Sequence, residues 1–383
     1  MNLRIESNQM AKNIPTKIFD SVLKDQTYLD QYGIGLNRQI QKLLKKVQDE
    51  ITGVIAKNDP TSPLLTKWKQ ARLKKLDDEI SVLLEDSYKN INLLTKTELV
   101  KMGKLQVKRT ANSFNKAVGV NIFDVALDKN TIKSIVNNTM IDGKVIGDWW
   151  KGQRDKLGDR ISQAMAKSTQ ALQIGMVQGE TVGGLITRIK GTALTPGVMS
   201  LAKREATALV RTSVMQVANG ARQELYKENA DVLEGVEFVA TLDNRTTPLC
   251  RSIDGLRYDM EYNPNGHSRS WPGSPPLHWQ CRTTLCPIPL SYSKLAGANS
   301  PLTNKQIREL DKMPPGVRST LNGDIPTNMT YGSWLKTLSA AEQKDILGAG
   351  RYKLYSENKL DMADLVNNSG KPLTLEQLRA KLS

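Results

Sequence analysis

The first third of the chain repeats apolar residues with the period of an α-helix. One stripe rises in steps of four, three, four and three positions, through Ile40, Leu44, Val47, Ile51 and Val54. The prolines of "NDPTSP" (58–63) interrupt the pattern. A second stripe follows, through Leu73, Leu76, Ile80, Leu83, Leu84, Tyr88 and Ile91. The two stripes predict an antiparallel helical hairpin over residues 36–109. It can pack within the chain, with a second copy or with a partner helix.

Further along, the pattern changes from helical to extended. Residues 198–229 keep a helical period, whereas "GVEFVATL" (235–242) is short, rich in β-formers and typical of a strand. Pro, Gly, Asn and Ser are then dense up to about residue 290, and helical patterns resume after Asn299. We therefore predict a mostly α protein with a small α+β domain. A helical region (1–140) would precede a core (141–290), with helices over 144–230 and a strand-and-loop segment over 235–290. A C-terminal helical segment (291–383) would follow.

Composition supports helices and argues against membrane insertion or secretion. Hydrophobic residues make up 39% of the chain and aromatic residues 5%, which suits helices packed through aliphatic side chains. We find no apolar run long enough to span a membrane and no secretory signal at the start. Three cysteines are an odd number, which argues against a disulfide scaffold. We expect an intracellular protein in a reducing compartment.

The net charge of +15 is concentrated in the first half of the chain. Residues 1–190 hold 31 Lys and Arg against 20 Asp and Glu, a balance of +11, whereas residues 191–383 hold 23 against 19, a balance of +4. Such an excess attracts polyanions, of which nucleic acid is the commonest, although a well-solvated helical surface explains it equally well. The segment "KMGKLQVKR" supplies the candidate contacts Lys101, Lys104, Lys108 and Arg109.

All three cysteines and both histidines lie between residues 250 and 286. Thiolates and imidazole are the ligands that Zn²⁺ prefers, so one structural zinc could be held by Cys250, His278, Cys281 and Cys286. Against this, no C-x-x-C pair is present and Cys286 follows Cys281 by five positions. In the alternative reading, the cysteines are small buried residues and His278 is hydrogen-bonded to backbone. A thiol enzyme, with Cys250 or Cys281 as nucleophile and His278 as base, lacks any supporting motif, and we expect no catalysis.

Several polar residues near this cluster suit turns and ion pairs. Asp243, Arg245 and Thr246 stand where the predicted strand ends, and an Asp there can accept backbone N–H groups. Arg245 can form a forked pair with a carboxylate. Gly255, which follows Asp254, suits a turn that requires positive φ. We expect structural roles for all of them.

Together these residues resemble the phage Mu F-like head morphogenesis family. The motif positions, in the order of the family, are Arg211, Thr212, Asn219, Asp243, Arg245, Thr246, Cys250, Asp254, Gly255, Pro276, His278, Cys281 and Arg282. The tail is similar to a segment found downstream in such proteins, through Trp334, Leu335, Gln343, Leu347, Gly348, Arg351 and Leu354. Family members often end the motif Cys-Arg-Cys, whereas here Thr283 stands in place of the second Cys.

The resemblance implies a minor head protein of a tailed bacteriophage. Such a protein would act with the portal and with scaffold or major capsid proteins in procapsid assembly, and in DNA packaging or delivery. It would pass from the host cytoplasm into the head interior near the portal. The basic helices would bind packaged DNA without reading its sequence. Two alternatives remain: a zinc-stapled nucleic-acid-binding module, and a toxin-like enzyme carrying a Mu F-like domain. Because little of the sequence follows the tail segment, we expect no appended toxin domain.

Overall fold

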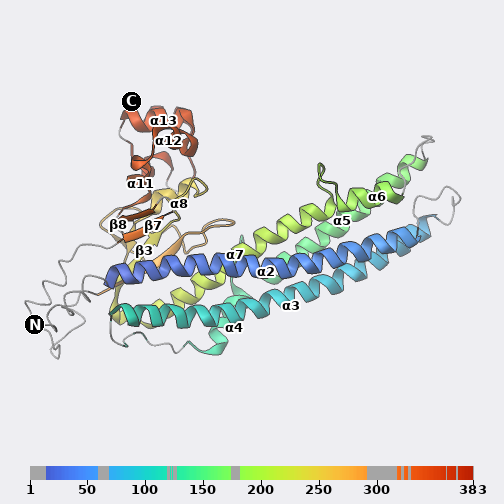
Figure 1. Ribbon diagram of the computed structural model, residues 1–383, viewed down its shortest axis with the longest axis horizontal. Coiled ribbons are helices and arrows are strands. Elements are labelled where there is room, and N and C mark those ends of the chain that lie inside the picture. The colour runs from blue at the N-terminus through green and yellow to red at the C-terminus, as the bar shows by residue number, and fades with distance from the viewer. Residues whose placement is uncertain are drawn as a thin grey trace, which may run out of the picture. The chain divides into compact units, whose positions relative to one another are not determined.

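The computed structural model describes residues 14–58, 69–118, 121, 123, 127–173, 182–290, 317–320, 323–326, 329–358, 360–367 and 370–382. The chain divides into two compact units. The first comprises residues 1–29, 103–129 and 218–383, and the second comprises residues 30–102 and 130–217. Figure 1 shows the helices and strands along the chain and labels many of them. Among the described residues, no helix combines the length and the apolar character that crossing a bilayer requires.

Two long helices, α2 (Ile14–Asn58) and α3 (Lys69–Val118), form the antiparallel hairpin that the stripes predict. Both helices extend beyond the predicted range of 36–109, because apolar residues continue to be buried past each end, among them Ile18, Val22, Ala111 and Phe114. The prolines of the predicted break, from Pro60 to Pro63, lie outside the described residues.

The second unit is a helical bundle. To its parts of α2 and α3 it adds α5 (Ile146–Gln173), α6 (Val182–Lys190) and the first part of α7 (Val198–Glu228). α4 (Lys129–Asn138) and a short hairpin of β1 (Met140–Ile141) and β2 (Lys144–Val145) precede α5. The Arg160 side chain of α5 pairs with Glu205 of α7 at 2.9 Å, and the Gln41 amide of α2 donates to the Lys203 carbonyl of α7 at 2.9 Å.

The first apolar stripe is buried inside this bundle. Ile40, Leu44 and Ile51 have no exposed surface. At the end of the stripe the structure buries Ile55 completely and leaves Val54 half-buried. The stripe from Ile40 to Ile55 is therefore buried by the packing of the bundle.

The first unit holds an antiparallel sheet with strand order β5-β4-β3-β6. Its strands are β3 (Leu233–Val239), which follows the 3-10 turn η1 (Ala230–Val232), β4 (Arg257–Tyr258), β5 (Pro264–Asn265) and β6 (Thr284–Pro289). A short helix, α8 (Pro248–Ile253), joins β3 to β4. The strand predicted over 235–242 ends three residues early. Its next N–H group, of Ala240, donates to the Asp254 carboxylate at 2.7 Å instead of to a neighbouring strand.

The tail of the first unit is helical and packs around aromatic residues. A hairpin of β7 (Val317–Thr320) and β8 (Gly323–Pro326) precedes α11 (Tyr331–Thr337), α12 (Ala340–Leu347), α13 (Ala349–Asn358), the 3-10 turn η3 (Met362–Leu365) and α14 (Leu375–Leu382). Tyr331, Trp334, Leu335 and Leu378 form their core, together with Leu242 from the end of the sheet.

The tail residues that resemble the family have structural roles. Gly348 ends α12 with φ +78°, a conformation that favours glycine. The Arg351 guanidinium donates to the Leu373 carbonyl at 3.0 Å, and the Gln343 amide donates to the Leu338 carbonyl at 2.8 Å. The predicted fold class, mostly α with a small α+β part, is confirmed.

Candidate metal centre

Two short segments bring three of the predicted ligands together. Thr247 caps the N-terminus of α8, with Pro248 at its first position, so that Cys250 faces inward from the first turn. His278 and Cys281 come from the loop before β6, where the Cys281 N–H donates to the His278 carbonyl at 3.2 Å. Gln280 adopts φ +58° inside this turn. The turn therefore presents both ligands to Cys250.

The three side chains form a compact, buried cluster. The Cys250 sulfur lies 3.1 Å from Nε2 of His278 and 3.7 Å from the sulfur of Cys281. The ligand atoms of all three residues lie within 4.8 Å of one another. Cys250 and Cys281 are almost completely buried, with 1% and 0% exposure. Two sulfurs and one imidazole nitrogen at such spacing are a suitable donor set for Zn²⁺.

The hydrogen bonds of His278 leave Nε2, the nitrogen that faces Cys250, in position to bind a metal. Nδ1 lies 2.9 Å from the Trp279 carbonyl, which can only accept, so Nδ1 carries the proton. Nε2 faces the Cys250 sulfur and lies 2.9 Å from the Thr247 hydroxyl. A backbone carbonyl that orients the far nitrogen of a ligating histidine is a common feature of metal sites.

The electrostatics of the cluster favour one thiolate. Hydrogen bonds from Cys250 and His278 lower the pKa of the Cys281 thiol, although burial opposes this shift. The same pairing with Cys281, together with burial, raises the pKa of Cys250. The pKa of His278 is raised by its hydrogen bond with Cys281. Because the thiolate is the metal-binding form of cysteine, Cys281 is prepared for that role.

The fourth predicted ligand, Cys286, is not part of this cluster. It lies on β6, where it pairs with Glu237 of β3, and its sulfur contacts the Pro287 carbonyl at 3.8 Å. Side chains alternate along a strand, so Cys286 shares a face with Thr284, which bonds Asn219 of α7. His267 is also elsewhere, with Nε2 at 2.8 Å from the Arg257 carbonyl. The spacing of the cysteines in the sequence did not show on which face of the strand Cys286 lies.

Asp243 forms an ion pair beside the cluster. Its carboxylate accepts two bonds from the Arg282 guanidinium, at 2.6 and 2.7 Å. It also accepts the backbone N–H groups of Arg245 and Thr246, each at 3.0 Å. Burial opposes the charged form, but the Arg282 pair and the Thr246 bond hold the pKa of Asp243 below its ordinary value. The exposed Arg245 side chain reaches the same carboxylate only at 3.5 Å.

Asp254 and Gly255 connect the sheet to the tail. Besides Ala240, the Asp254 carboxylate accepts the Tyr331 N–H at the start of α11, at 2.8 Å. Gly255 has φ +81°, and a Cβ atom there would lie 2.8 Å from Cγ2 of Thr330. Thr330 caps α11. The Asp-Gly pair therefore fixes where the tail meets the sheet, and Pro276 lies half-buried in the loop that leads to His278.

The motif residues of α7 have separate environments. Arg211 is exposed, whereas Thr212 is buried and its hydroxyl donates to the Ala208 carbonyl at 2.9 Å. Asn219 accepts the Thr284 hydroxyl at 2.7 Å.

Sequence reasoning missed Arg222, which is 1% exposed. It donates to the same Thr284 hydroxyl at 2.7 Å and lies 3.7 Å from the buried carboxylate of Asp25. Its position three residues after Asn219, on the same helical face, was the available signal.

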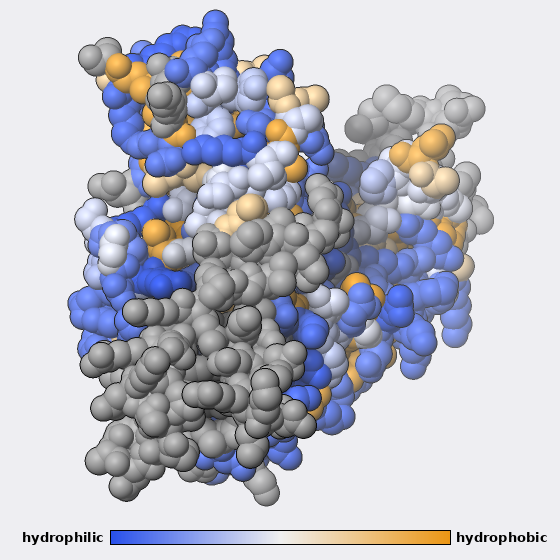
Figure 2. Space-filling view, turned by 60° about the vertical axis from the view of Figure 1, so that its left-hand side comes forward, coloured by the Kyte–Doolittle hydropathy of each residue, from blue (hydrophilic) through white to orange (hydrophobic). Residues whose placement is uncertain are grey.

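The candidate DNA-binding residues of α3 differ in their ion pairs and in their exposure. Arg109 pairs with Asp25 at 2.7 Å and lies over the ring of Tyr28, so its charge has a structural use. Lys101 pairs with Glu98 at 2.7 Å but remains largely exposed. Lys104 and Lys108 are exposed. On the face drawn in Figure 2, hydrophilic residues dominate the described surface.

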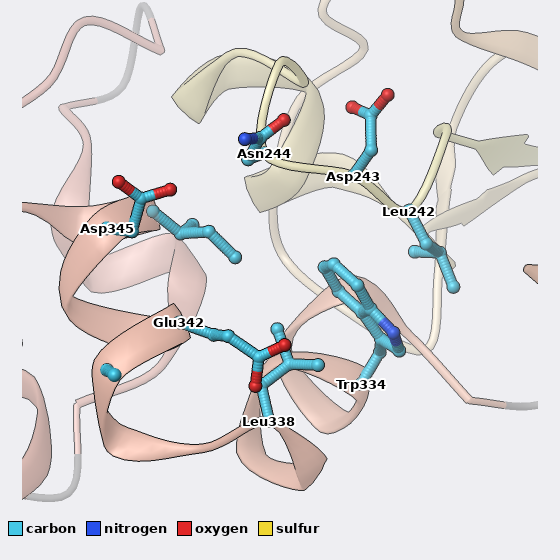
Figure 3. Close-up of a pocket in the computed structure, with 9 residues that line it drawn as sticks. Leu242, Asp243, Asn244, Trp334, Leu338, Glu342 and Asp345 are labelled. Atoms are coloured by element: carbon cyan, nitrogen blue, oxygen red, sulfur yellow. The ribbon is translucent and has the colours of Figure 1, made fainter. Parts of the chain in front are cut away.

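A larger cavity lies next to Asp243 and contains no Cys or His. Its volume is about 440 Å³, and its walls are mostly apolar, with Leu242, Trp334, Leu338 and Ile346. Glu342 and Asp345 of α12 also line it. Figure 3 shows the Asp243 carboxylate turned away from the Trp334 ring, consistent with its pairing to Arg282. The cavity can accept an apolar group with a cation beside it.

Comparison with known proteins supports the motif assignment. Residues 166–286 match the family model described as phage Mu protein F like protein, which is 121 of the 383 positions. No curated protein and no solved structure matched the chain. The family resemblance predicted from the motif is confirmed over these residues.

Proposed function

We propose that this chain, whose Mu F-like region supports a role in phage head morphogenesis, is a minor head protein that acts with the portal during procapsid assembly. The observation that carries the proposal is that the matched region contains the motif residues from Arg211 to Arg282 in the order of the family. The family also supports association with the virion, and we place the protein in the head interior near the portal.

Quantitative mass spectrometry of purified particles tests this proposal. We expect a few copies of the chain per particle, far fewer than of the major capsid protein, and capture of the portal protein by tagged chain from assembling cells. A copy number equal to that of the major capsid protein, or absence from both procapsids and particles, would contradict it.

We propose a structural rather than a catalytic role. The carboxylates near the cluster are engaged in structural contacts, Asp243 with Arg282 and Asp254 with the N–H groups of Ala240 and Tyr331. A general acid or base needs access to a reacting group, and these contacts occupy both side chains. The alternative of a zinc-stapled nucleic-acid-binding module is favoured only by the cluster together with the exposed lysines of α3.

Non-specific DNA binding through α3 is a further part of the proposal, and Lys104 and Lys108 are its best candidates because both are exposed. Binding to random duplex DNA should weaken linearly as salt rises on a double-logarithmic scale. Reversing both charges (Lys104→Glu with Lys108→Glu) should lower that slope by about 2, since each phosphate contact contributes about 0.9. Lys353, exposed on α13, provides the matched control. An unchanged slope would exclude these two residues from the DNA contact.

The cavity beside Asp243 is our candidate site for a partner protein of the head. On a chain with net charge +15, the carboxylates of Glu342 and Asp345 favour a partner segment with an apolar side chain next to Lys or Arg. Ala341→Trp would fill the cavity and Asp345→Lys would reverse its charge, and both residues are exposed. We expect both variants to fold but to reduce portal or capsid association, whereas Glu357→Lys on α13 should have no effect. Full association of both variants would contradict the assignment.

We also propose that Cys250, His278 and Cys281 hold one zinc ion that stabilises the fold. The support is the donor set, its burial and the orientation of His278. Elemental mass spectrometry of the purified chain should find about one zinc per chain, lost in Cys250→Ser and in His278→Ala. Removal by a chelator should lower the melting temperature, because zinc binding stabilises the fold. A folded chain without stoichiometric metal would refute this part.

A further inference from the structure

The cluster offers one ligand fewer than a closed zinc site requires. Structural zinc sites have four protein ligands, whereas three protein ligands leave a position for water or another small ligand. Among the described residues, three ligand atoms gather here, and Cys286 lies on the strand face toward α7.

A threonine stands beside the cluster where a fourth ligand would be needed. Thr283 is 1% exposed and lines a small cavity together with Cys250 and His278. The Thr247 hydroxyl lies on the same side, 2.9 Å from Nε2 of His278. Neutral hydroxyls are not among the usual zinc ligands, which are thiolate, imidazole and carboxylate. The hydroxyls of Thr247 and Thr283, which line the same cavity, can instead hydrogen-bond a bound water.

A small cavity adjoins the ligands at this side. It measures about 20 Å³ and is lined by Cys250, His278, Thr247 and Thr283, together with Arg245 and Arg282. A cavity needs roughly 10–15 Å³ of such volume to hold one water molecule, so this one has room for a single small ligand. The two guanidinium groups share one carboxylate, that of Asp243, so a net positive charge remains beside the cavity. This charge favours water, hydroxide or a small anion in the open position.

We propose that Cys250, His278 and Cys281 form a three-ligand metal site whose fourth position is open to an exchangeable water or small anion. This inference rests on the zinc site proposed above and adds to it a ligand-binding position. Thr283 keeps the position open, and the substitution Thr283→Cys would close it with a third thiolate.

Cobalt substitution tests the open position directly. The full chain is purified, its metal exchanged for Co²⁺, and the visible absorption recorded while azide is added. We expect one cobalt per chain and an absorption change that saturates with azide. In Thr283→Cys the four-ligand site should show no response to azide. This variant should also bind cobalt more than about tenfold more tightly, since even second-shell partners change metal affinity by about 10–100-fold.

The controls separate this inference from the zinc site itself. Cys286→Ser should bind cobalt and respond to azide as the wild-type chain does, because Cys286 is not part of the cluster. Thr283→Ala enlarges the cavity without adding a ligand, so it should keep the azide response even if Thr283→Cys does not fold. Cobalt binding with no azide response in the unchanged chain and in Thr283→Ala would overturn the open position but leave the metal site. Absence of stoichiometric metal would overturn both.

Discussion

Two regions are stabilised in different ways: the helical bundle of the second unit, and the part of the Mu F-like region that lies in the first unit (residues 218–286, here the Mu F-like end). In the bundle, a stripe such as Ile40, Leu44 and Ile51 is buried through repeated apolar contacts, none of which requires one particular residue type. At the Mu F-like end, single polar groups with defined partners fix the geometry, such as Asp243 with Arg282. Apolar stripes tolerate exchange among residues of similar volume, whereas a paired carboxylate does not. This explains why most of the motif positions lie in the second region, whereas the bundle contributes only Arg211 and Thr212.

The largest expected effect comes from removing the Asp243 carboxylate. Asp243→Ala takes away the partner of Arg282 and the acceptor for two backbone N–H groups. Breaking a buried pair in this way costs about 3–5 kcal/mol of unfolding free energy. Urea unfolding of the variant and of Arg245→Ala provides the measurement. Arg245 is 72% exposed, so its loss should change stability by no more than about 0.5 kcal/mol. Equal losses in the two variants would contradict the assignment of the ion pair.

A comparable test in the bundle uses neighbouring positions of α2. Ile51→Ala should cost about 2–5 kcal/mol, because the side chain is completely buried and leaves a cavity. Ile51→Val, which conserves shape, should cost only about 0.5–1.5 kcal/mol. If the contrast between the two regions is correct, Asp243→Asn, equally conservative in volume, will be far more costly than Ile51→Val. The same unfolding assay compares them.

Substitution of Gly255 should cause a smaller loss of stability, part of which a second substitution, at Thr330, should restore. Gly255→Ala places a side chain at φ +81° and puts its Cβ against Thr330, and the left-handed conformation alone costs about 1–2 kcal/mol. Thr330→Ser keeps the cap of α11 but removes the clashing methyl group. The double variant should therefore recover the loss of stability that is due to the clash, and keep the loss that is due to backbone strain. Thermal unfolding of both variants and the double variant separates the two, and a full recovery would argue against strain.

The smallest expected effect is a pH dependence. Since the pKa of Asp243 is lowered in the folded chain, its contribution to stability is complete above the unfolded value of about 3.9. That contribution is lost as pH falls through the folded pKa. The difference in stability between the unchanged chain and Asp243→Asn should therefore be constant from pH 7 to about pH 5 and shrink below about pH 4. A difference that grows on acidification would show that another group is responsible.

The sequence predicted different features in the two regions, and the reasons are physical. Helical period identified the stripe of α2 but not whether Val54 or Ile55 completes it, because the two lie at about 50° on either side of its centre at 3.6 residues per turn. The neighbouring helices make that choice, and they bury Ile55. The Cys250, His278 and Cys281 cluster was predictable from ligand types, whereas the facing of Cys286 depends on the register of β6.

Contacts between distant parts of the sequence were beyond prediction. Arg222 and Asp25 lie on different helices, and local pattern carries no sign that they meet. The role of Asp254 was likewise hidden, because Tyr331 follows it by 77 positions. In each case a polar group is bound by a partner that only the tertiary fold supplies.

The double attachment of Asp254 has a practical consequence for dissecting the molecule. Its carboxylate binds one N–H from the end of β3 and another from the start of α11, and the neighbouring Arg251 guanidinium donates to the Ile346 carbonyl of α12 at 3.0 Å. A chain truncated at residue 290 would leave Asp254 without the Tyr331 N–H and Arg251 without the Ile346 carbonyl, and it would uncover Leu242. Such a fragment should be insoluble or partly unfolded, and adding residues 329–382 in trans should rescue it. The sheet of the first unit and the tail are in this sense one folding unit.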